Sequence, residues 1–266
     1  MIDWMLRRAG LLGLTALFLA GCTSTTMPQT GFLDRTVKVD GVAYPYVVYV
    51  PRDWTPHRKW PVILFLHGAG ERGTEGHRQT QIGLGSAIRG MPEQIPAIAV
   101  FPQAPPESQW LGLPSEAAMH ALDEAIDEFQ GDRDRLYLTG LSLGGFGTWH
   151  LALAHPQTFA AIVPVCGGIV PHGSATSVRQ SPLTAGTADP YKFTAEHLRH
   201  IPVWIFHGAD DPVILPSESQ KMRDALHDAG GDVRYIEYPG VGHNAWEPAY
   251  REPSLWAWLF QQSLHR

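Results

Sequence analysis

A serine flanked by two glycines is the residue whose setting most directly indicates chemistry in this chain. Gly140, Ser142 and Gly144 form a G-x-S-x-G pattern that follows the apolar run RLYLT and precedes a stretch with helical character. A sharp turn from strand to helix at such a pattern exposes the serine hydroxyl at the end of a sheet. Crowding in the turn leaves no room for Cβ atoms at the flanking positions, which accounts for the glycines. The pattern predicts that Ser142 is a nucleophile.

A nucleophilic serine needs a base and a third group that orients the base, and two later loops supply candidates. The apolar run IPVWIF leads into HGADDP, so both Asp210 and Asp211 lie just past a predicted strand. The run VRYIEY leads into PGVGHNAW, which places His243 in a glycine-rich loop. Because the carboxyl ends of parallel strands gather at one edge of a sheet, we expect an aspartate and His243 to meet the serine there.

The stretch HGAGERG, residues 67–73, has glycines in G-x-G-x-x-G spacing and follows the apolar run PVILFL. A dinucleotide-binding fingerprint would require a helix that begins on the glycines and an acid about twenty residues further on. The residues that follow, TEGHRQTQIGLG, are polar and interrupted by glycines. We therefore favour a loop in which glycines let a backbone N–H approach a substrate carbonyl and stabilise an oxyanion.

Eight short segments are predicted to be the strands that carry these loops. They are residues 35–40, 44–50, 61–66, 97–101, 135–140, 160–165, 201–206 and 233–238. The first two alternate in polarity and are joined through Asp40-Gly41, a turn dipeptide, which predicts a β-hairpin. The later runs are apolar throughout, which indicates strands that are covered on both faces.

Helical patterns lie between these strands. Residues 115–130 have apolar positions at helical spacing, and Ser115 is the predicted N-cap. Further helices are predicted at residues 143–156, 217–231 and 254–262. A hairpin followed by β-α alternation predicts an α/β fold: one mostly parallel eight-stranded sheet with helices on both faces, in a single domain. The longest stretch between strands, residues 167–200, is the candidate for a small cap, and no large lid is predicted.

Together these segments resemble the α/β-hydrolases, and among them the polyhydroxybutyrate-depolymerase-like, feruloyl-esterase-like and dienelactone-hydrolase-like carboxylesterases. The matching segments are LHGAGERG, FPQAPPESQW, GLSLGGFGTWHLALAHP, FHGADDP and YPGVGHNAW. Such relatives carry the acid in an H-G-x-x-D pattern, which counted from His207 gives Asp211, and Pro212 favours an extended backbone there. The resemblance also implies that the backbone N–H groups of Ala69 and Leu143 form the oxyanion hole.

The resemblance implies a serine carboxylic-ester hydrolase that acts on small or medium esters through an acyl-enzyme. Ser142 would attack the ester carbonyl, His243 would take its proton, and Asp211 would orient the imidazole. Trp110 and Trp246 lie in loops near the inferred site and are candidates for lining the substrate pocket. Two alternatives stay open. One is a serine peptidase of the prolyl-oligopeptidase type, and the other is a non-catalytic binding lipoprotein with a hydrolase fold.

The N-terminus has the features of an export signal. Arg7 and Arg8 precede the apolar run AGLLGLTALFLA, which is too short to span a bilayer as a helix. The following residues, Leu19-Ala20-Gly21-Cys22, resemble the lipobox of bacterial lipoproteins. This resemblance divides the chain into a signal peptide at 1–21, a tether at 22–33 and a catalytic domain at 34–266.

A lipobox implies that Cys22 carries the lipid and anchors the exported protein to a membrane. Thr23 follows Cys22, where an aspartate would favour the inner membrane in that family. The expected location is therefore the periplasmic side or the cell surface, with the outer membrane favoured. The membrane and a small-molecule or polymeric ester are the predicted partners.

Composition argues against several other classes of function. The formal charge is −6 and there is no Lys/Arg run, so no nucleic-acid partner is predicted. Cys22 and Cys166 are the only cysteines, and the 13 histidines have no zinc-site spacing, so neither a metal nor another cofactor is predicted. Cys166 lies in an apolar run and is predicted to be a buried thiol of the core. The sequence specifies neither the ester nor the oligomeric state.

Overall fold

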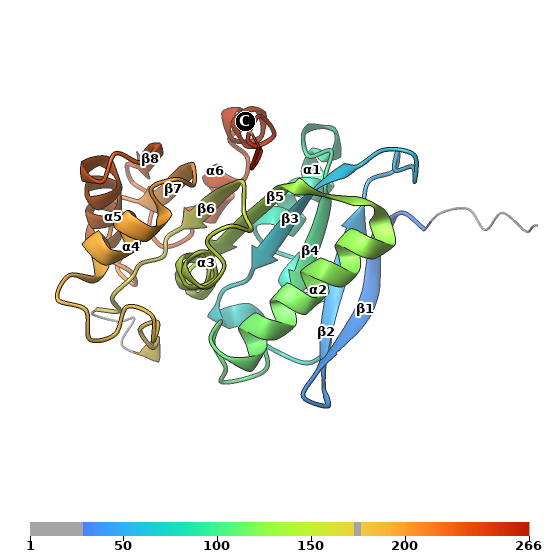
Figure 1. The fold of residues 1–266 in the computed structure, drawn as a ribbon, viewed down its shortest axis with the longest axis horizontal. Helices are drawn as coiled ribbons and strands as arrows, with labels where there is room; N and C mark the ends of the chain where they lie inside the picture. Colours follow the sequence, from blue (N-terminus) through green and yellow to red (C-terminus); the bar gives the residue numbers. More distant parts are fainter. Residues whose placement is uncertain (1–28, 173–176, 266) are drawn as a thin grey trace, which may run out of the picture.

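The computed structural model describes residues 29–172 and 177–265, which are built around one eight-stranded sheet (Figure 1). The strands lie in the order β1-β2-β4-β3-β5-β6-β7-β8. β2 is antiparallel to both β1 and β4, and the remaining neighbours are parallel. The strands are β1 Gly31–Val39, β2 Val42–Val50, β3 Trp60–Leu66, β4 Ile98–Pro102, β5 Gly131–Leu141, β6 Ala161–Val165, β7 Val203–Gly208 and β8 Val233–Tyr238.

Helices and short 3-10 turns connect the strands. The α-helices are α1 Leu84–Gly90, α2 Leu113–Phe129, α3 Leu143–Ala154, α4 Pro190–Leu198, α5 Ser217–Asp228, α6 Trp246–Ala249 and α7 Pro253–Leu259. The 3-10 turns are η1 Ala69–Glu71, η2 Arg78–Thr80 and η3 Pro92–Gln94. The eight predicted strands and the predicted helices after β4, β5, β7 and β8 are therefore all present.

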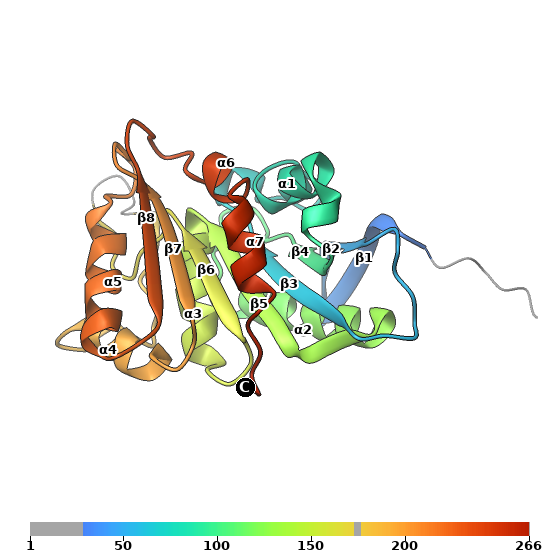
Figure 2. The same ribbon diagram turned by 90° about the horizontal axis from the view of Figure 1, so that it is seen from above.

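The two faces of the sheet are both covered by helices (Figure 2). Buried side chains of α2, α3, α4 and α5 form one apolar cluster with the sheet, and those of α1 and α7 form another. Along β3, Leu64 and Leu66 belong to the first cluster, whereas Ile63 and Phe65 belong to the second. Because successive strand side chains point to opposite faces, a doubly covered strand must be apolar throughout. The predicted mostly parallel, two-sided sheet is confirmed.

The N-terminal hairpin turns where it was predicted to turn. Asp40 and Gly41 both have positive φ, 49° and 79°, as a two-residue hairpin with the right-handed strand twist requires. β1 begins at Gly31, three residues before the boundary between tether and domain that the sequence indicated at 33–34. The predicted signal peptide and Cys22 lie outside the described residues. Within the two described ranges, no helix has both the length and the apolar character needed to cross a membrane.

Some helix ends and short helices differ from the sequence-based expectations. Ser115 is not the N-cap of α2, because the helix begins two residues earlier, after Gly112 in a positive-φ conformation of 60°. The Ser115 hydroxyl instead donates to the Gly112 carbonyl at 3.0 Å. α4 begins at Pro190 and is capped by the Asp189 carboxylate, which accepts two backbone N–H groups. A proline at the first helical position and an aspartate as N-cap are standard signals for the start of a helix. Both lie within residues 167–200, for which the sequence predicted only a candidate cap and no helix.

Candidate active site

Ser142 lies in a strained turn between β5 and α3, with φ 55° and ψ −117°. A Cβ at Gly140 would lie 2.3 Å from the carbonyl oxygen of Gly144, and one at Gly144 would lie 1.9 Å from that of Leu66. Only glycine fits at either position, so α3 can begin directly against the ends of β3 and β5. A positive φ at a serine is costly and is typical of residues that are held for function.

His243 joins Ser142 to Asp211 in a continuous hydrogen-bonded chain. The Nε2 atom of His243 lies 2.9 Å from the Ser142 hydroxyl oxygen, and Nδ1 lies 2.7 Å from Oδ2 of Asp211. Because a carboxylate can only accept, Nδ1–H donates to Asp211, and Nε2 of the neutral ring accepts the serine proton. The three residues follow β5, β7 and β8, so the parallel sheet brings their loops to one edge. This arrangement can remove a proton from the serine as it attacks.

The Asp211 carboxylate is buried and fully hydrogen-bonded. Burial by itself would raise its pKa, but hydrogen bonds from His207 and His243 and from the backbone of Ile214 and Val213 hold the pKa well below its usual range. The N–H groups of Val213 and Ile214 donate to Oδ1 at 2.8 and 3.0 Å. The carboxylate is therefore charged and rigid wherever the protein is folded near neutral pH.

The neighbouring Asp210 does not take part in this chain. It is exposed, and its backbone N–H donates to the carbonyl of Val241 at 2.9 Å. The structure thus brings Asp211, and not Asp210, to His243. His207 is a further neighbour whose contact with the carboxylate the sequence did not reveal. Its Nε2 lies 3.2 Å from Oδ2 of Asp211, and its Nδ1 lies 2.7 Å from the hydroxyl of Ser219.

The loop after β3 passes directly beside the serine. A Cβ at Gly68 would lie 3.6 Å from Cβ of Ser142 and 2.9 Å from a methyl group of Leu141, so this backbone runs in van der Waals contact with the turn that carries the serine. Ala69 is the first residue of η1, and Leu143 is the first residue of α3. The first N–H groups of a helix have no acceptor within it, so both residues offer backbone donors near the serine.

Hydrogen bonds hold this loop in place. His67 is fully buried, and burial lowers its pKa to about 4, so the ring is neutral at pH 7. Its Nε2 accepts from the N–H of Ala104 at 2.9 Å, which leaves Nδ1–H to donate to the carbonyl of Gly68 at 2.6 Å. The Arg72 guanidinium donates to the carbonyls of Ala69 and Ser108 at 2.9 and 3.3 Å. These bonds fix the backbone that would face a substrate carbonyl.

The two tryptophans proposed for the substrate pocket have different surroundings. Trp110 is 2% exposed, and its indole N–H donates to the carbonyl of His67 at 3.0 Å. Trp110 also lines a pocket beside Leu143. Trp246 is half-buried and packs edge-on against the ring of His243, with 5.4 Å between ring centroids. Trp246 is absent from the lining of that pocket and instead contacts the imidazole directly.

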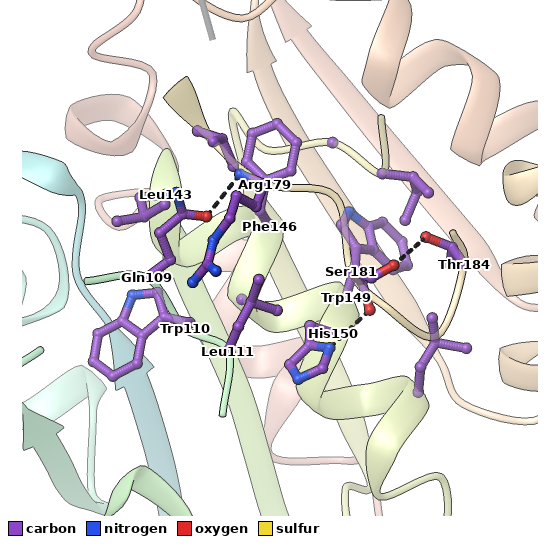
Figure 3. Close-up of a pocket in the computed structure, with 15 residues that line it drawn as sticks. Gln109, Trp110, Leu111, Leu143, Phe146, Trp149, His150, Arg179, Ser181 and Thr184 are labelled. Atoms are coloured by element: carbon purple, nitrogen blue, oxygen red, sulfur yellow. Dashed lines mark hydrogen bonds between the residues drawn. The ribbon is translucent and has the colours of Figure 1, made fainter. Parts of the chain in front are cut away.

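The pocket beside Leu143 runs along α3 (Figure 3), and its cavity volume is about 20 Å³, room for roughly one water molecule. Its walls come from α3, from residues 109–111, from residues 168–169 and from residues 178–184. Residues 168–169 and 178–184, which belong to the candidate cap segment, therefore lie against one side of α3. Trp149, Phe146 and Leu111 are among the lining residues that the close-up draws.

One cluster of potential metal ligands lies in the described part of the chain, and it coincides with the serine site. Ligand atoms of Cys166, Asp211 and His243 lie within 4.8 Å of one another. Asp211 and His243 already bond each other, and burial raises the pKa of the Cys166 thiol well above its usual value. These groups are thus poorly suited to a cation. Cys166 is fully buried, as predicted for a core thiol.

Comparisons with known proteins identify a hydrolase family and several similar proteins. The profile of the prolyl oligopeptidase family matches residues 109–264. An uncharacterised secreted protein of Arthroderma benhamiae is 28% identical over 209 residues, covering 70% of this chain and 21% of that protein. A putative carboxymethylenebutenolidase of Salmonella typhimurium is 32% identical over 127 residues, covering 47% of this chain and 43% of that protein. The chain spans less than half the length of these two relatives.

A protein of known structure is also similar to this chain. The crystal structure of a thermostable esterase is 34% identical and superposes with a TM-score of 0.74, covering 87% of this chain and 63% of that chain. The family profile spans Ser142, Leu143, Asp211 and His243, whereas Ala69 lies before its first matched residue. Because the esterase structure covers 87% of this chain, its similarity extends beyond residues 109–264, which the family profile matches, into the preceding part of the sheet.

Proposed function

This chain belongs to the prolyl oligopeptidase family, and on that premise we propose that it is a serine hydrolase that cleaves carboxylic esters of small or medium size. Its sheet and helices form the α/β-hydrolase fold that the sequence resemblance implied. The observation that carries the proposal is the hydrogen-bonded chain from Ser142 through His243 to Asp211. A buried carboxylate, an oriented imidazole and a serine on a strained turn together make an activated nucleophile.

The reaction would proceed in two steps through an acyl-enzyme. As the hydroxyl oxygen of Ser142 attacks the ester carbonyl, its proton passes to Nε2 of His243, and Asp211 stabilises the resulting imidazolium. The N–H groups of Ala69 and Leu143 would donate to the oxyanion, and each such donor is worth about 10²–10³ in rate. The alcohol leaves with the proton from His243. In the second step His243 takes a proton from the water that attacks the acyl group and returns it to the Ser142 oxygen, and the free acid leaves.

Similarity to esterases favours ester over peptide substrates. The thermostable esterase is 34% identical to this chain, and the matched Salmonella typhimurium relative is named a putative carboxymethylenebutenolidase. The family name itself refers to peptidases, so a serine peptidase is the second candidate. An ester carbonyl is also the easier target, because it has less resonance stabilisation than an amide and because an alkoxide leaves more readily than an amide anion.

Variants of Ser142 test the proposal. Wild-type protein should hydrolyse p-nitrophenyl butyrate, and Ser142→Ala should lose that turnover while keeping the wild-type circular dichroism spectrum and melting temperature. A fluorophosphonate probe should label the wild type alone. A peptide p-nitroanilide assayed in parallel distinguishes the peptidase. Undiminished ester hydrolysis by Ser142→Ala would refute the assignment, and a wild type that neither labels nor turns over would favour a binding protein.

We also propose that the protein is exported and anchored through lipid on Cys22. The proposal is supported by the lipobox-like residues 19–22 and the basic, then apolar, residues before them. Full-length protein expressed in a bacterium with lipoprotein processing should fractionate with membranes and incorporate labelled palmitate. Cys22→Ser should abolish the labelling. Labelling that is equal in both proteins would exclude Cys22 as the anchor.

A further inference from the structure

The chain of polar contacts that begins at Ser142 does not end at Asp211. Oδ2 of Asp211 lies between two imidazoles, 2.7 Å from Nδ1 of His243 and 3.2 Å from Nε2 of His207. The other ring nitrogen of His207, Nδ1, lies 2.7 Å from the hydroxyl oxygen of Ser219. The contacts therefore run, in order, through Ser142, His243, Asp211, His207 and Ser219.

The neighbours of His207 determine which of its ring nitrogens carries hydrogen. Nε2 lies 2.9 Å from the carbonyl oxygen of Ile214 and 3.2 Å from the carboxylate of Asp211. A carbonyl and an ionised carboxylate can only accept, so Nε2 must be protonated and must share its hydrogen between them. In the neutral ring, Nδ1 then has the lone pair and accepts from the Ser219 hydroxyl. Ser219 thereby stabilises the tautomer that presents an N–H to Asp211.

His207 restrains both the carboxylate of Asp211 and the turn that carries it. Oδ1 of Asp211 accepts the N–H groups of Val213 and Ile214 at 2.8 and 3.0 Å. The carbonyl of Ile214 in turn accepts from His207. Rotation of the carboxylate would break the bonds at Oδ1 and move Oδ2 away from His207. The position of Oδ2 that keeps all of these contacts is the one that accepts from His243.

These contacts are shielded from water. The side chains of His207 and Asp211 are 0% exposed, and Ser219 is 3% exposed. In such surroundings a hydrogen bond is stronger than in water, and a polar group that loses its partner is costly because no water replaces it. His207 and Ser219 are also too deeply buried to touch a substrate, so any effect that they have on turnover must pass through Asp211.

The serine at the end of this chain is explained by its contact with His207. Ser219 is the third residue of α5, which packs against β7, the strand that carries His207 (Figure 1). It does not cap the helix, because the N-cap is Pro216. Neither helix propensity nor burial favours serine over alanine at such a position, since alanine is the better helix former and is apolar. The bond to Nδ1 of His207 is therefore what requires the hydroxyl.

We propose that His207 and Ser219 are positioning residues of this site. Ser219 fixes the tautomer of His207, and His207 in turn holds Oδ2 of Asp211 in line with the imidazole of His243. This inference rests on the proposed ester hydrolysis and deepens it. During the attack by Ser142, the imidazole becomes an imidazolium whose Nδ1–H must stay bonded to the carboxylate. A carboxylate that is held in advance does not have to reorganise at that moment, so the two residues raise kcat and leave KM unchanged.

Two substitutions of His207 test the proposal. His207→Met removes the N–H donor and keeps a side chain of similar length. Its kcat for p-nitrophenyl butyrate should fall about tenfold to hundredfold at unchanged KM, as expected for loss of a hydrogen bond to a charged group. His207→Gln keeps an N–H donor near the position of Nε2 and should restore most of this loss. A folded His207→Met with wild-type kcat would overturn the proposal, and so would equal losses in both variants, because the donor would then not matter.

Ser219→Ala tests the outer end of the chain, and it is the milder change should His207→Met not fold. Its kcat should fall about twofold to tenfold, as expected for loss of a neutral hydrogen bond. Ser115→Ala is the matched control. Ser115 is likewise the third residue of its helix and is 5% exposed, but its hydroxyl bonds the carbonyl of Gly112. This control should keep wild-type kcat, and equal values of kcat in Ser219→Ala and Ser115→Ala would overturn the proposal.

A spectroscopic measurement separates this inference from the proposed function. The hydrogen between Nδ1 of His243 and Asp211 should give a far-downfield proton resonance in protein labelled with ¹⁵N-histidine. The resonance should shift or broaden in His207→Met and Ser219→Ala and stay unchanged in Ser115→Ala. A wild type that hydrolyses no ester would refute the proposed function alone, because the resonance still reports on Asp211. Absence of the resonance from the wild type, or its persistence unchanged in His207→Met and Ser219→Ala, would overturn the proposal.

Discussion

Gly144→Ala is expected to disable the serine without touching any side chain of the proposed machinery. An ideal Cβ at residue 144 would lie 1.9 Å from the carbonyl oxygen of Leu66, 2.5 Å from its carbonyl carbon and 2.8 Å from the carbonyl oxygen of His67. All three atoms belong to the backbone at and just after the end of β3, so no side-chain rotation relieves the overlap. The start of α3 must move away from the sheet.

The size of that movement follows from the distances. Real Cβ atoms essentially never lie within 3.0 Å of such neighbours, so the separation must grow by at least 3.0 − 1.9 = 1.1 Å. Ser142 and Leu143 directly precede the altered residue and would be displaced with it. A misplacement of about 1 Å can reduce turnover by about 10²-fold. The overpacking should also lower the free energy of unfolding by about 1–3 kcal/mol.

The assay is kcat for p-nitrophenyl butyrate, measured well below the melting temperature of each variant. Gly90→Ala is the control, since no heavy atom lies within 4 Å of its ideal Cβ and its φ is not positive. That variant should keep wild-type kcat and stability or gain slightly. If Gly144→Ala folds incompletely, the fluorophosphonate labelling rate of the folded fraction reports on the serine alone. A folded Gly144→Ala with wild-type kcat and labelling rate would refute the argument.

Two further predictions concern Asp211 and His67. Asp211→Asn should reduce kcat about 10⁴-fold by favouring the wrong imidazole tautomer, whereas Asp210→Asn, at an exposed position, should behave as wild type; similar losses in both would contradict the geometry. His67 has its pKa lowered from 6.5 to about 4, so the unfolded state binds the proton more readily and stability rises with pH. Its contribution is complete above about pH 6.5 and is lost as the pH falls toward 4, a change on the order of 3 kcal/mol. Urea titrations at pH 7 and 4 should therefore show a smaller acid-induced loss for His67→Gln than for wild type, and equal losses would refute this linkage.

The strands and the placement of Ser142 and His243 could be predicted because both are encoded locally. Most strands after the N-terminal hairpin contain a short apolar run, and a parallel sheet gathers the loops after those runs at one edge. Asp210 and Asp211 show the limit of such reasoning. They are adjacent and chemically identical, and only the fold decides which of them accepts the N–H groups of Val213 and Ile214 and becomes buried. The H-G-x-x-D resemblance supplied the preference for Asp211.

The pocket could not be predicted, because it depends on contacts between distant segments. Gln109 is 70 residues from Arg179 and 68 from Ser177, and no periodicity or turn signal relates them. The contact between His207 and Asp211, 3.2 Å between Nε2 and Oδ2, was likewise not predicted, because the strand-end motif contains both residues but does not specify where their side chains point. α1 escaped detection for a different reason. Its seven residues include two glycines, so propensity did not favour a helix there.

Ser142 and His243 lie far apart in the sequence, so the ribosome synthesises the serine well before the histidine. Ser142 is synthesised 101 residues before His243, which at about 5–20 residues per second is an interval on the order of 5 to 20 s. β5, which carries Ser142, depends on still later residues. The Tyr137 hydroxyl donates to the carbonyl of Gln262 at 2.9 Å, and the Leu264 N–H donates to that of Asp134 at 3.0 Å. A nascent chain shorter than 243 residues therefore carries Ser142 without its proposed base.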